Sequence, residues 1–173
     1  MRIRPADPED GKLVDALLKA AFPGPTEARL VVSLRAADAD VLELVADADG
    51  AIQGMVMFSP VTIQPPIGEA IFGLGLAPLA VQPEVQKRGI GAALVEAALE
   101  FVPTLGAPFC VVLGAPDYYG RFGFQPARSH QLFWDGDLDA THGDAFQFLS
   151  LAPDKLGSIA GVASYHAAFS ELE

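Results

Sequence analysis

The sequence predicts a single domain of the mixed α/β (α+β) class, and three observations carry that prediction. The chain has 173 residues, a length that suits one domain spanning residues 1–173. Hydrophobic residues make up 51% of it and charged residues only 19%, which supplies enough apolar side chains for a packed core. Strand patterns joined by a hairpin come early, and strand–helix–strand patterns come late.

The N-terminal third predicts a strand, two helices and a β-hairpin. The sequence Pro23-Gly24-Pro25 separates the two helical patterns, because proline and glycine end helices. Asp49-Gly50 is typical of a tight turn between two strands. These five elements are expected at residues 3–5, 7–21, 26–34, 41–46 and 51–58.

The remainder predicts three more strands, one long helix and one short one. Apolar spacing along 90–101 follows the helical period, with Pro103 and Gly106 ending the helix. Pro78 interrupts the preceding strand, and a distortion is expected there because proline cannot donate a ladder hydrogen bond. The other elements are expected at residues 70–81, 109–113, 118–122 and 145–151.

Charge and cysteine content exclude several classes of function. There are 22 acidic and 11 basic residues, a net charge of −11, which argues against nucleic acid or an anionic membrane as a partner. The longest nearly apolar run, 71–81, falls short of the ~20 residues that span a membrane. The one cysteine, Cys110, lies in an apolar run and predicts a buried thiol, with no internal disulfide and no cysteine-based zinc site. A cytoplasmic location is therefore expected.

The segment from Leu79 to Val95 carries the most specific chemical signal. A strand leads into a loop, and Gly89 and Gly91 open an amphipathic helix. The free N–H groups at a helix start bind anions, and glycines let a phosphate approach the backbone closely. Lys87 and Arg88 add positive charge at the rim. The pattern indicates a pyrophosphate site.

Two common nucleotide motifs do not fit this loop. A P-loop needs Lys-Ser/Thr after its second glycine, but Ala92-Ala93 stands there. A Rossmann fingerprint needs a small residue where Leu94 lies, and its glycines follow the strand directly. The remaining alternative is structural: the glycines ease helix packing and bind nothing.

Two motifs give the chain a family resemblance. The run Gln86-Lys87-Arg88-Gly89-Ile90-Gly91 resembles the Gln/Arg-x-x-Gly-x-Gly/Ala signature of the GCN5-related N-acetyltransferase (GNAT) superfamily. Residues 76–83 look like the fourth strand of that fold, and 118–124 like its aromatic second signature. The combination is similar to the bacterial YhbS-like predicted acetyltransferases. The resemblance implies a mostly antiparallel twisted sheet with splayed central parallel strands 4 and 5, flanked by helices.

The resemblance also implies acetyl-CoA as the acyl donor and no metal. In the family, amides of the signature loop bind the pyrophosphate, and backbone groups of the fourth strand pair with pantetheine. Carried over, the cofactor-binding residues are Leu79, Val81, Gln86, Lys87, Arg88, Gly89, Ile90, Gly91 and Ala92. Many relatives carry an asparagine after the fifth strand where this chain has Gly114-Ala115, so contacts in that turn stay open. A longer acyl chain as donor also stays open.

Tyr119 is the implied catalytic residue, because family members often use a tyrosine four residues before the Gly-Phe pair to protonate the departing thiolate. Tyr118 is the alternative, and a third reading has both rings only packing the helix on the sheet. No residue identifies itself as a general base, and a water relay would replace one. The implied reaction is direct attack by a primary amine in a ternary complex. A GNAT-fold acyl-CoA-binding or regulatory protein without turnover is the alternative.

The acceptor is expected to be a small-molecule or peptide amine. Residues 85–134 hold four basic and three acidic side chains, a net of +1, and the rest of the chain carries −12. The segment without acidic excess is the one assigned to the anionic cofactor, and the acidic remainder suggests a cationic amine as acceptor. Dimers are common in the superfamily, so the resemblance allows a homodimer.

Overall fold

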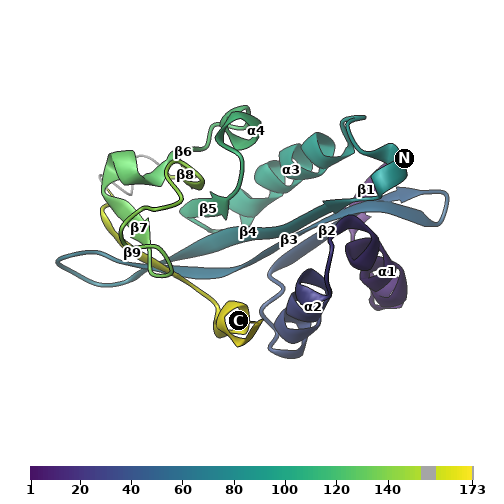
Figure 1. Ribbon diagram of the computed structural model, residues 1–173, viewed down its shortest axis with the longest axis horizontal. Coiled ribbons are helices and arrows are strands. Elements are labelled where there is room, and N and C mark those ends of the chain that lie inside the picture. The colour runs from purple at the N-terminus through teal and green to yellow at the C-terminus, as the bar shows by residue number, and fades with distance from the viewer. Residues whose placement is uncertain (153–158, 173) are drawn as a thin grey trace. The chain divides into compact units, whose positions relative to one another are not determined.

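The computed structural model describes residues 1–152 and 159–172 (Figure 1). The chain forms two compact units. The first contains Met1–Ser59, Ala77–Val102 and Ala167–Glu173, and the second contains Pro60–Leu76 and Pro103–His166. The long strands β3 (Ala51–Gln64) and β4 (Ile71–Val81) each contribute to both.

The first unit packs helices on both faces of an antiparallel sheet. β1 pairs with β2, and β2 pairs with the first part of β3. In Figure 1, α1 and α2 lie on one face of these strands and α3 lies on the other. The further elements are β1 (Arg2–Pro5), α1 (Gly11–Ala21), α2 (Thr26–Ala36), β2 (Leu42–Ala48) and α3 (Ile90–Phe101), with short 3-10 turns at Pro8–Asp10, Pro83–Val85, Val102–Leu105 and Ala167–Leu172.

Helical spacing in the sequence builds the core of this unit. Apolar residues of α1 and α2, Leu17 and Leu34 among them, pack with Val45 of β2 and Met55 and Met57 of β3, and all are essentially inaccessible to solvent. On the opposite face, Gly54 of β3 lets α3 approach closely, because a Cβ there would lie 2.9 Å from Leu94 Cδ1. All three helices, α1, α2 and α3, therefore pack against the same sheet.

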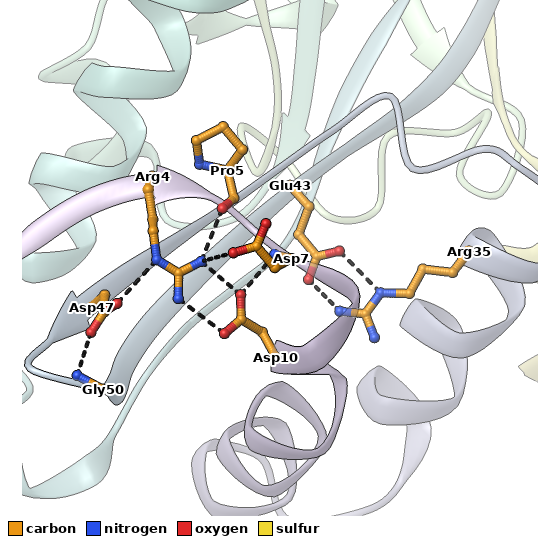
Figure 2. A network of polar contacts seen from close by, with 8 residues as sticks. All are labelled: Arg4, Pro5, Asp7, Asp10, Arg35, Glu43, Asp47 and Gly50. Atoms are coloured by element: carbon orange, nitrogen blue, oxygen red, sulfur yellow. Dashed lines mark hydrogen bonds and ion pairs between the residues drawn. The ribbon is translucent and has the colours of Figure 1, made fainter.

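A polar network ties β1 to the start of α1 and to β2 (Figure 2). Arg4 donates two hydrogen bonds to the Asp10 carboxylate, Nη1 to Oδ2 at 2.7 Å and Nη2 to Oδ1 at 3.0 Å. Its Nε donates to Asp47 Oδ2 at 3.0 Å, and the Asp7 N–H donates to Asp10 Oδ2 at 2.7 Å. Hydrogen bonding to Arg4 holds the pKa of Asp10 below its usual value. In the same view, Arg35 of α2 pairs with Glu43 of β2.

The second unit is centred on a parallel strand pair. β4 and β5 pair in parallel through Leu74 with Cys110 and Leu76 with Val112. β8 pairs antiparallel with β5, β6 with β8, and β9 with the end of β3, while β7 lies parallel to β9. The elements are β5 (Phe109–Leu113), α4 (Pro116–Gly120), β6 (Gln125–Pro126), a 3-10 turn (Ala127–His130), β7 (Leu132–Trp134), β8 (Phe146–Ser150) and β9 (Gly161–Tyr165).

The structure confirms the predicted fold class: a mixed, largely antiparallel sheet with a parallel β4–β5 pair and flanking helices. Three details differ from the sequence prediction. β3 continues to Gln64, past Pro60. Pro60 falls between the residues that pair with β2 and those that pair with β9, where a missing N–H disturbs neither ladder. The short helix begins two residues early, at Pro116, and the short strands β6, β7 and β9 were not anticipated. Across the described part of the chain, no helix has the length and apolar character to cross a membrane.

Candidate functional site: the signature loop and the β5–α4 turn

The signature loop in the first unit is anchored to the sheet at its entrance. The Gln82 N–H donates to the Gln53 carbonyl of β3 at 2.8 Å, directly after β4 ends at Val81. A 3-10 turn over Pro83–Val85 follows. The Gln86 side chain then folds back, and its Nε2 donates to the Val81 carbonyl at 3.1 Å. Gln86, predicted to bind the cofactor at the loop entrance, therefore uses its side chain to fix the end of β4.

The loop ends at the start of α3, where backbone N–H groups have no intrahelical hydrogen-bond acceptor. Gly89, with φ of 87°, is the N-cap, and the first helical bond runs from the Ala93 N–H to the Gly89 carbonyl at 3.0 Å. Helix geometry therefore leaves the N–H groups of Ile90, Gly91 and Ala92 without intrahelical acceptors. Lys87 also adopts a left-handed conformation, with φ of 61°. A left-handed residue followed by a right-handed one, as in Gly89 and Ile90, turns successive amides toward one side, which is the backbone geometry of anion-binding turns.

This loop is open to a ligand. Gln86, Lys87, Arg88 and Gly89 are exposed, and a Cβ built on Gly89 would meet nothing within 4 Å. The N-terminal end of a helix carries a positive partial charge, and the two cationic side chains add to it. The donors, the charge and the space fit a pyrophosphate group. Leu79 and Val81, the two β4 residues predicted to contact the cofactor, are half-buried, and the Val81 carbonyl already accepts the Gln86 hydrogen bond.

Tyr119, the predicted catalytic residue, lies in the second unit on α4, the short helix after β5. Its side chain is largely buried, with 9% of the residue exposed. The ring makes edge contacts with Tyr118 at 5.0 Å and Phe124 at 5.9 Å between ring centroids. Burial raises the pKa of the Tyr119 phenol above its usual value. The hydroxyl therefore keeps its proton throughout the neutral range.

Tyr118, the alternative, has a more open position. It is half-buried, and the Arg121 guanidinium lies over its ring at 4.6 Å from the centroid. A cation stacked on the ring occupies one face of it. Of the two tyrosines, Tyr119 is the one enclosed by the turn, and Tyr118 forms part of its enclosure.

Sequence reasoning missed Gln147 of β8, whose side chain the structure places against the β5–α4 turn. Strand alternation over residues 145–151 gave no reason to expect a fully buried amide, yet Gln147 has no exposed surface. Its Nε2 donates to the carbonyls of Gly114 at 3.2 Å and Ala145 at 3.3 Å. The only sequence signal is a polar residue between two phenylalanines of a short strand, Phe146 and Phe148.

Two further ionisable side chains, those of Asp137 and Cys110, have structural roles. Asp137 accepts hydrogen bonds from the N–H and hydroxyl of Thr141 and from the N–H and Nδ1 of His142, at 2.6–2.8 Å. Those bonds lower the pKa of the Asp137 carboxyl. Cys110 is completely buried, and burial raises the pKa of its thiol, as expected for an unreactive cysteine. Among residues 1–152 and 159–172, no group of three or more His, Cys, Asp or Glu side chains is arranged to hold a metal ion.

Sequence comparison relates the whole chain to known proteins. A family model described as the acetyltransferase (GNAT) domain matches residues 40–126. The uncharacterized N-acetyltransferase YhbS of Escherichia coli K12 is 39% identical over 175 residues, which cover 99% of this chain and all of the relative. A second E. coli K12 relative, the uncharacterized N-acetyltransferase YjhQ, is 33% identical over 69% of this chain and 67% of its own length.

Comparison of structures gives the same relationship. The crystal structure of E. coli YhbS in complex with CoA has a TM-score of 0.87 at 38% identity, covering 98% of this chain and 91% of that one. A GNAT family acetyltransferase from Brucella melitensis, crystallised with acetyl-CoA, has a TM-score of 0.76 at 35% identity, covering 97% of each chain. The domain match, the full-length sequence identity and the shared fold agree: the protein belongs to the GNAT acetyltransferase family.

Proposed function

We propose that the protein is an acetyl-CoA-dependent N-acetyltransferase that transfers an acetyl group to a primary amine by direct attack in a ternary complex. The signature loop is the observation that carries this proposal. It presents the unpaired amides of Ile90, Gly91 and Ala92 beside two cationic side chains, which is the arrangement an acyl-CoA pyrophosphate requires. The structures of relatives with CoA and acetyl-CoA bound support the same donor.

Each part of the loop has its own task in this proposal. The backbone from Arg88 to Ala92 binds the pyrophosphate, and Lys87 and Arg88 add charge at its rim. Gln86 fixes the end of β4 through the Val81 carbonyl. Backbone groups of Leu79 and Val81 pair with the pantetheine amides and polarise the thioester carbonyl. Donors held in place before the reaction stabilise a developing oxyanion at no cost of reorganisation.

Tyr119 completes the reaction as the general acid. The neutral amine attacks the thioester carbonyl carbon, a C–N bond forms, and the C–S bond breaks. The Tyr119 hydroxyl gives its proton to the departing CoA sulfur, the extra proton on the new amide nitrogen leaves to water, and the Tyr119 phenolate recovers a proton from water. Burial favours the neutral phenol, so Tyr119 enters each cycle protonated.

The proposal also covers the domain organisation, the acceptor and the cellular location. Residues 1–173 act as one N-acetyltransferase domain, and the acceptor is a small-molecule or peptide amine. A cytoplasmic location is part of the proposal, and it agrees with a chain whose one cysteine is a buried free thiol.

Substitution of Gly89 by alanine tests the loop. A Cβ at this left-handed residue costs about 1–2 kcal/mol in backbone conformation and lies where the phosphate must approach. We expect acetyl-CoA to raise the melting temperature of the wild-type protein, and Gly89→Ala to reduce both this shift and the rate of CoA thiol release with an amine panel. Gly50→Ala is the matched control, because Gly50 has φ of 90° and equally open surroundings in the β2–β3 turn.

The control separates loss of binding from loss of stability. Gly50→Ala should lower the melting temperature without changing the increment that acetyl-CoA adds. No stabilisation of the wild-type protein by acetyl-CoA would contradict the proposal. Stabilisation without thiol release from any amine would instead favour a protein that binds acyl-CoA without turnover.

A further inference from the structure

The turn between β5 and α4 is held in place from the neighbouring strand. Gly114 is the first residue after β5, and its N–H donates to the Ala145 carbonyl at 2.9 Å. Its carbonyl accepts a hydrogen bond from Gln147 Nε2 at 3.2 Å. Both polar groups of this one peptide residue are thus bound to the chain segment around the start of β8, which lies beside β5 with Gln147 opposite Val112.

The Tyr119 ring lies directly on Gly114. A Cβ built on Gly114 would lie 2.5 Å from Tyr119 Cε2 and 3.1 Å from its Cδ2, so only glycine leaves room for the ring. The next carbonyl, that of Ala115, accepts hydrogen bonds from the N–H groups of Tyr118 and Tyr119, each at 3.1 Å. The position of the Gly114 backbone therefore sets the position of the ring.

Gln147 is an unusual residue for a purely structural role. It is completely buried, and among the residues that the structure describes its Oε1 has no hydrogen-bond partner. A buried acceptor left unpaired destabilises the folded state, whereas an apolar side chain of the same shape at this position would not carry that penalty. What such an apolar residue could not replace is the amide donor, which binds the Gly114 carbonyl and, at 3.3 Å, the Ala145 carbonyl.

We propose that Gln147 is a positioning residue for Tyr119: its buried amide holds the Gly114 carbonyl and so fixes the β5–α4 turn on which the Tyr119 ring lies. This inference rests on the proposed function, in which the Tyr119 hydroxyl protonates the leaving thiolate. A general acid must lie within hydrogen-bond reach of the atom it protonates, and a shift of about 1 Å can reduce the rate of the step ~100-fold.

A double-mutant cycle with Gln147→Leu and Tyr119→Phe tests the proposal. We expect Gln147→Leu to lower kcat by roughly 10- to 100-fold while KM for acetyl-CoA stays close to the wild-type value. We expect Tyr119→Phe to lower kcat as well, and the double variant to be no slower than Tyr119→Phe alone, because the displaced ring then carries no acid. Gln125→Leu is the matched control on the adjacent strand β6: its side chain is exposed, and kcat should not change.

The Gly114→Ala variant gives a second route to the same displacement. Its Cβ drives the ring away while Gln147 stays intact, so it should lower kcat in the Tyr119 protein and not in the Tyr119→Phe protein. Near-ultraviolet circular dichroism and melting temperature establish that each variant is folded. If Gln147→Leu fails this check, Gly114→Ala carries the test.

The outcomes separate this inference from the proposed function. The positioning role is overturned if Gln147→Leu leaves kcat unchanged. It is also overturned if Gln147→Leu lowers kcat by the same factor in the Tyr119→Phe protein as in the wild-type protein. Either result leaves Tyr119 as the acid. A Tyr119→Phe variant with full activity overturns the role of Tyr119 itself, and the inference with it. If Gln147→Leu raises KM for acetyl-CoA and leaves kcat unchanged, the positioning role is overturned, because Gln147 then contributes to acetyl-CoA binding.

Discussion

Asp10 shows how one charged side chain organises the N-terminus of this fold. Its carboxylate is nearly inaccessible, lies at the start of α1 and accepts two hydrogen bonds from Arg4. A carboxylate near a helix N-terminus also interacts favourably with the helix dipole. Because Arg4 belongs to β1 and also binds Asp47 of β2, Asp10 connects one helix with two strands (Figure 2).

Replacing Asp10 by asparagine should destabilise the protein in a pH-dependent way. At pH 7 we expect a loss of about 2 kcal/mol in unfolding free energy, as for charge-assisted hydrogen bonds that are partly buried. The pKa of Asp10 is depressed in the folded state, so its stabilisation is present above the unfolded pKa of about 3.9 and disappears as pH falls through the folded value. Urea unfolding of both proteins between pH 7 and pH 2.5 measures this difference.

The control for this comparison is Asp15→Asn. Asp15 forms a surface ion pair with Lys19, and such pairs contribute about 0.3–0.5 kcal/mol. Its loss should be small at every pH. A constant difference between wild type and Asp10→Asn down to pH 2.5 would contradict the electrostatic account.

Tyr119 and Gln147 differ in how far the sequence alone predicts their importance at the β5–α4 turn. Tyr119 belongs to an aromatic turn whose composition marks it, and the structure buries most of its ring within that turn. Gln147 belongs to no motif, and its proposed role rests on a hydrogen bond to Gly114, 33 positions away in the chain. Local spacing carries no information about a partner that the sheet register brings close.

At the scale of elements, the first turn of α3 depends on how closely the helix packs against β3. Gly54 of β3 faces Leu94 and Ile90 of α3, and a Cβ there would approach Ile90 Cγ2 to 3.1 Å and the Ala80 carbonyl to 3.1 Å. Ile90 is the first residue of α3 and adjoins the signature loop. The absence of a side chain at residue 54 therefore helps to place the amides that we propose bind the pyrophosphate.

Substituting Gly54 by valine should displace α3 and weaken donor binding. Overpacking of this kind costs about 1–3 kcal/mol, and we expect a lower melting temperature together with a smaller stabilisation by acetyl-CoA. Ala51→Val is the control, because Ala51 lies on the same strand and is exposed. A Gly54→Val protein that loses stability but keeps the full increment from acetyl-CoA would show that the loop is positioned independently of this contact.

The elements that the sequence predicted are those whose apolar pattern continues over many residues or that contain a strong turn signal. The helical spacing of α1, α2 and α3 and the Asp49-Gly50 turn are local properties, and each corresponds to an observed element. β7 has only three residues, and β9 lacks the continuous apolar run that predicted the equally short β5, so neither is distinguished from loop by its sequence. They become strands because β9 pairs with β3 and then with β7, a tertiary requirement.

At the scale of the whole molecule, the charge distribution bears on the acceptor. The 50 residues from 85 to 134 are nearly neutral, and the rest of the chain carries the negative charge. An acidic protein attracts cations over distances of about 8 Å at physiological ionic strength. This favours acceptors that keep a positive charge beside the reacting amine.

The corresponding prediction concerns salt. For a diamine acceptor with one permanently charged group, we expect KM to rise as NaCl increases from 20 to about 200 mM, because screening weakens the attraction. A neutral monoamine of similar size, assayed at a pH above its pKa, is the control and should show little change. Equal activity on both acceptors with no dependence on salt would contradict a cationic acceptor.

The buried thiol of Cys110 makes the strand that precedes Tyr119 observable in solution. It is the one cysteine in the sequence, it is the second residue of β5, and no part of it is exposed. A chromogenic thiol reagent added to the native protein therefore reacts with released CoA and reaches the enzyme only when β5 opens. The same reagent can follow turnover and, without substrates, time the local unfolding of the strand that leads into the turn bearing the proposed acid.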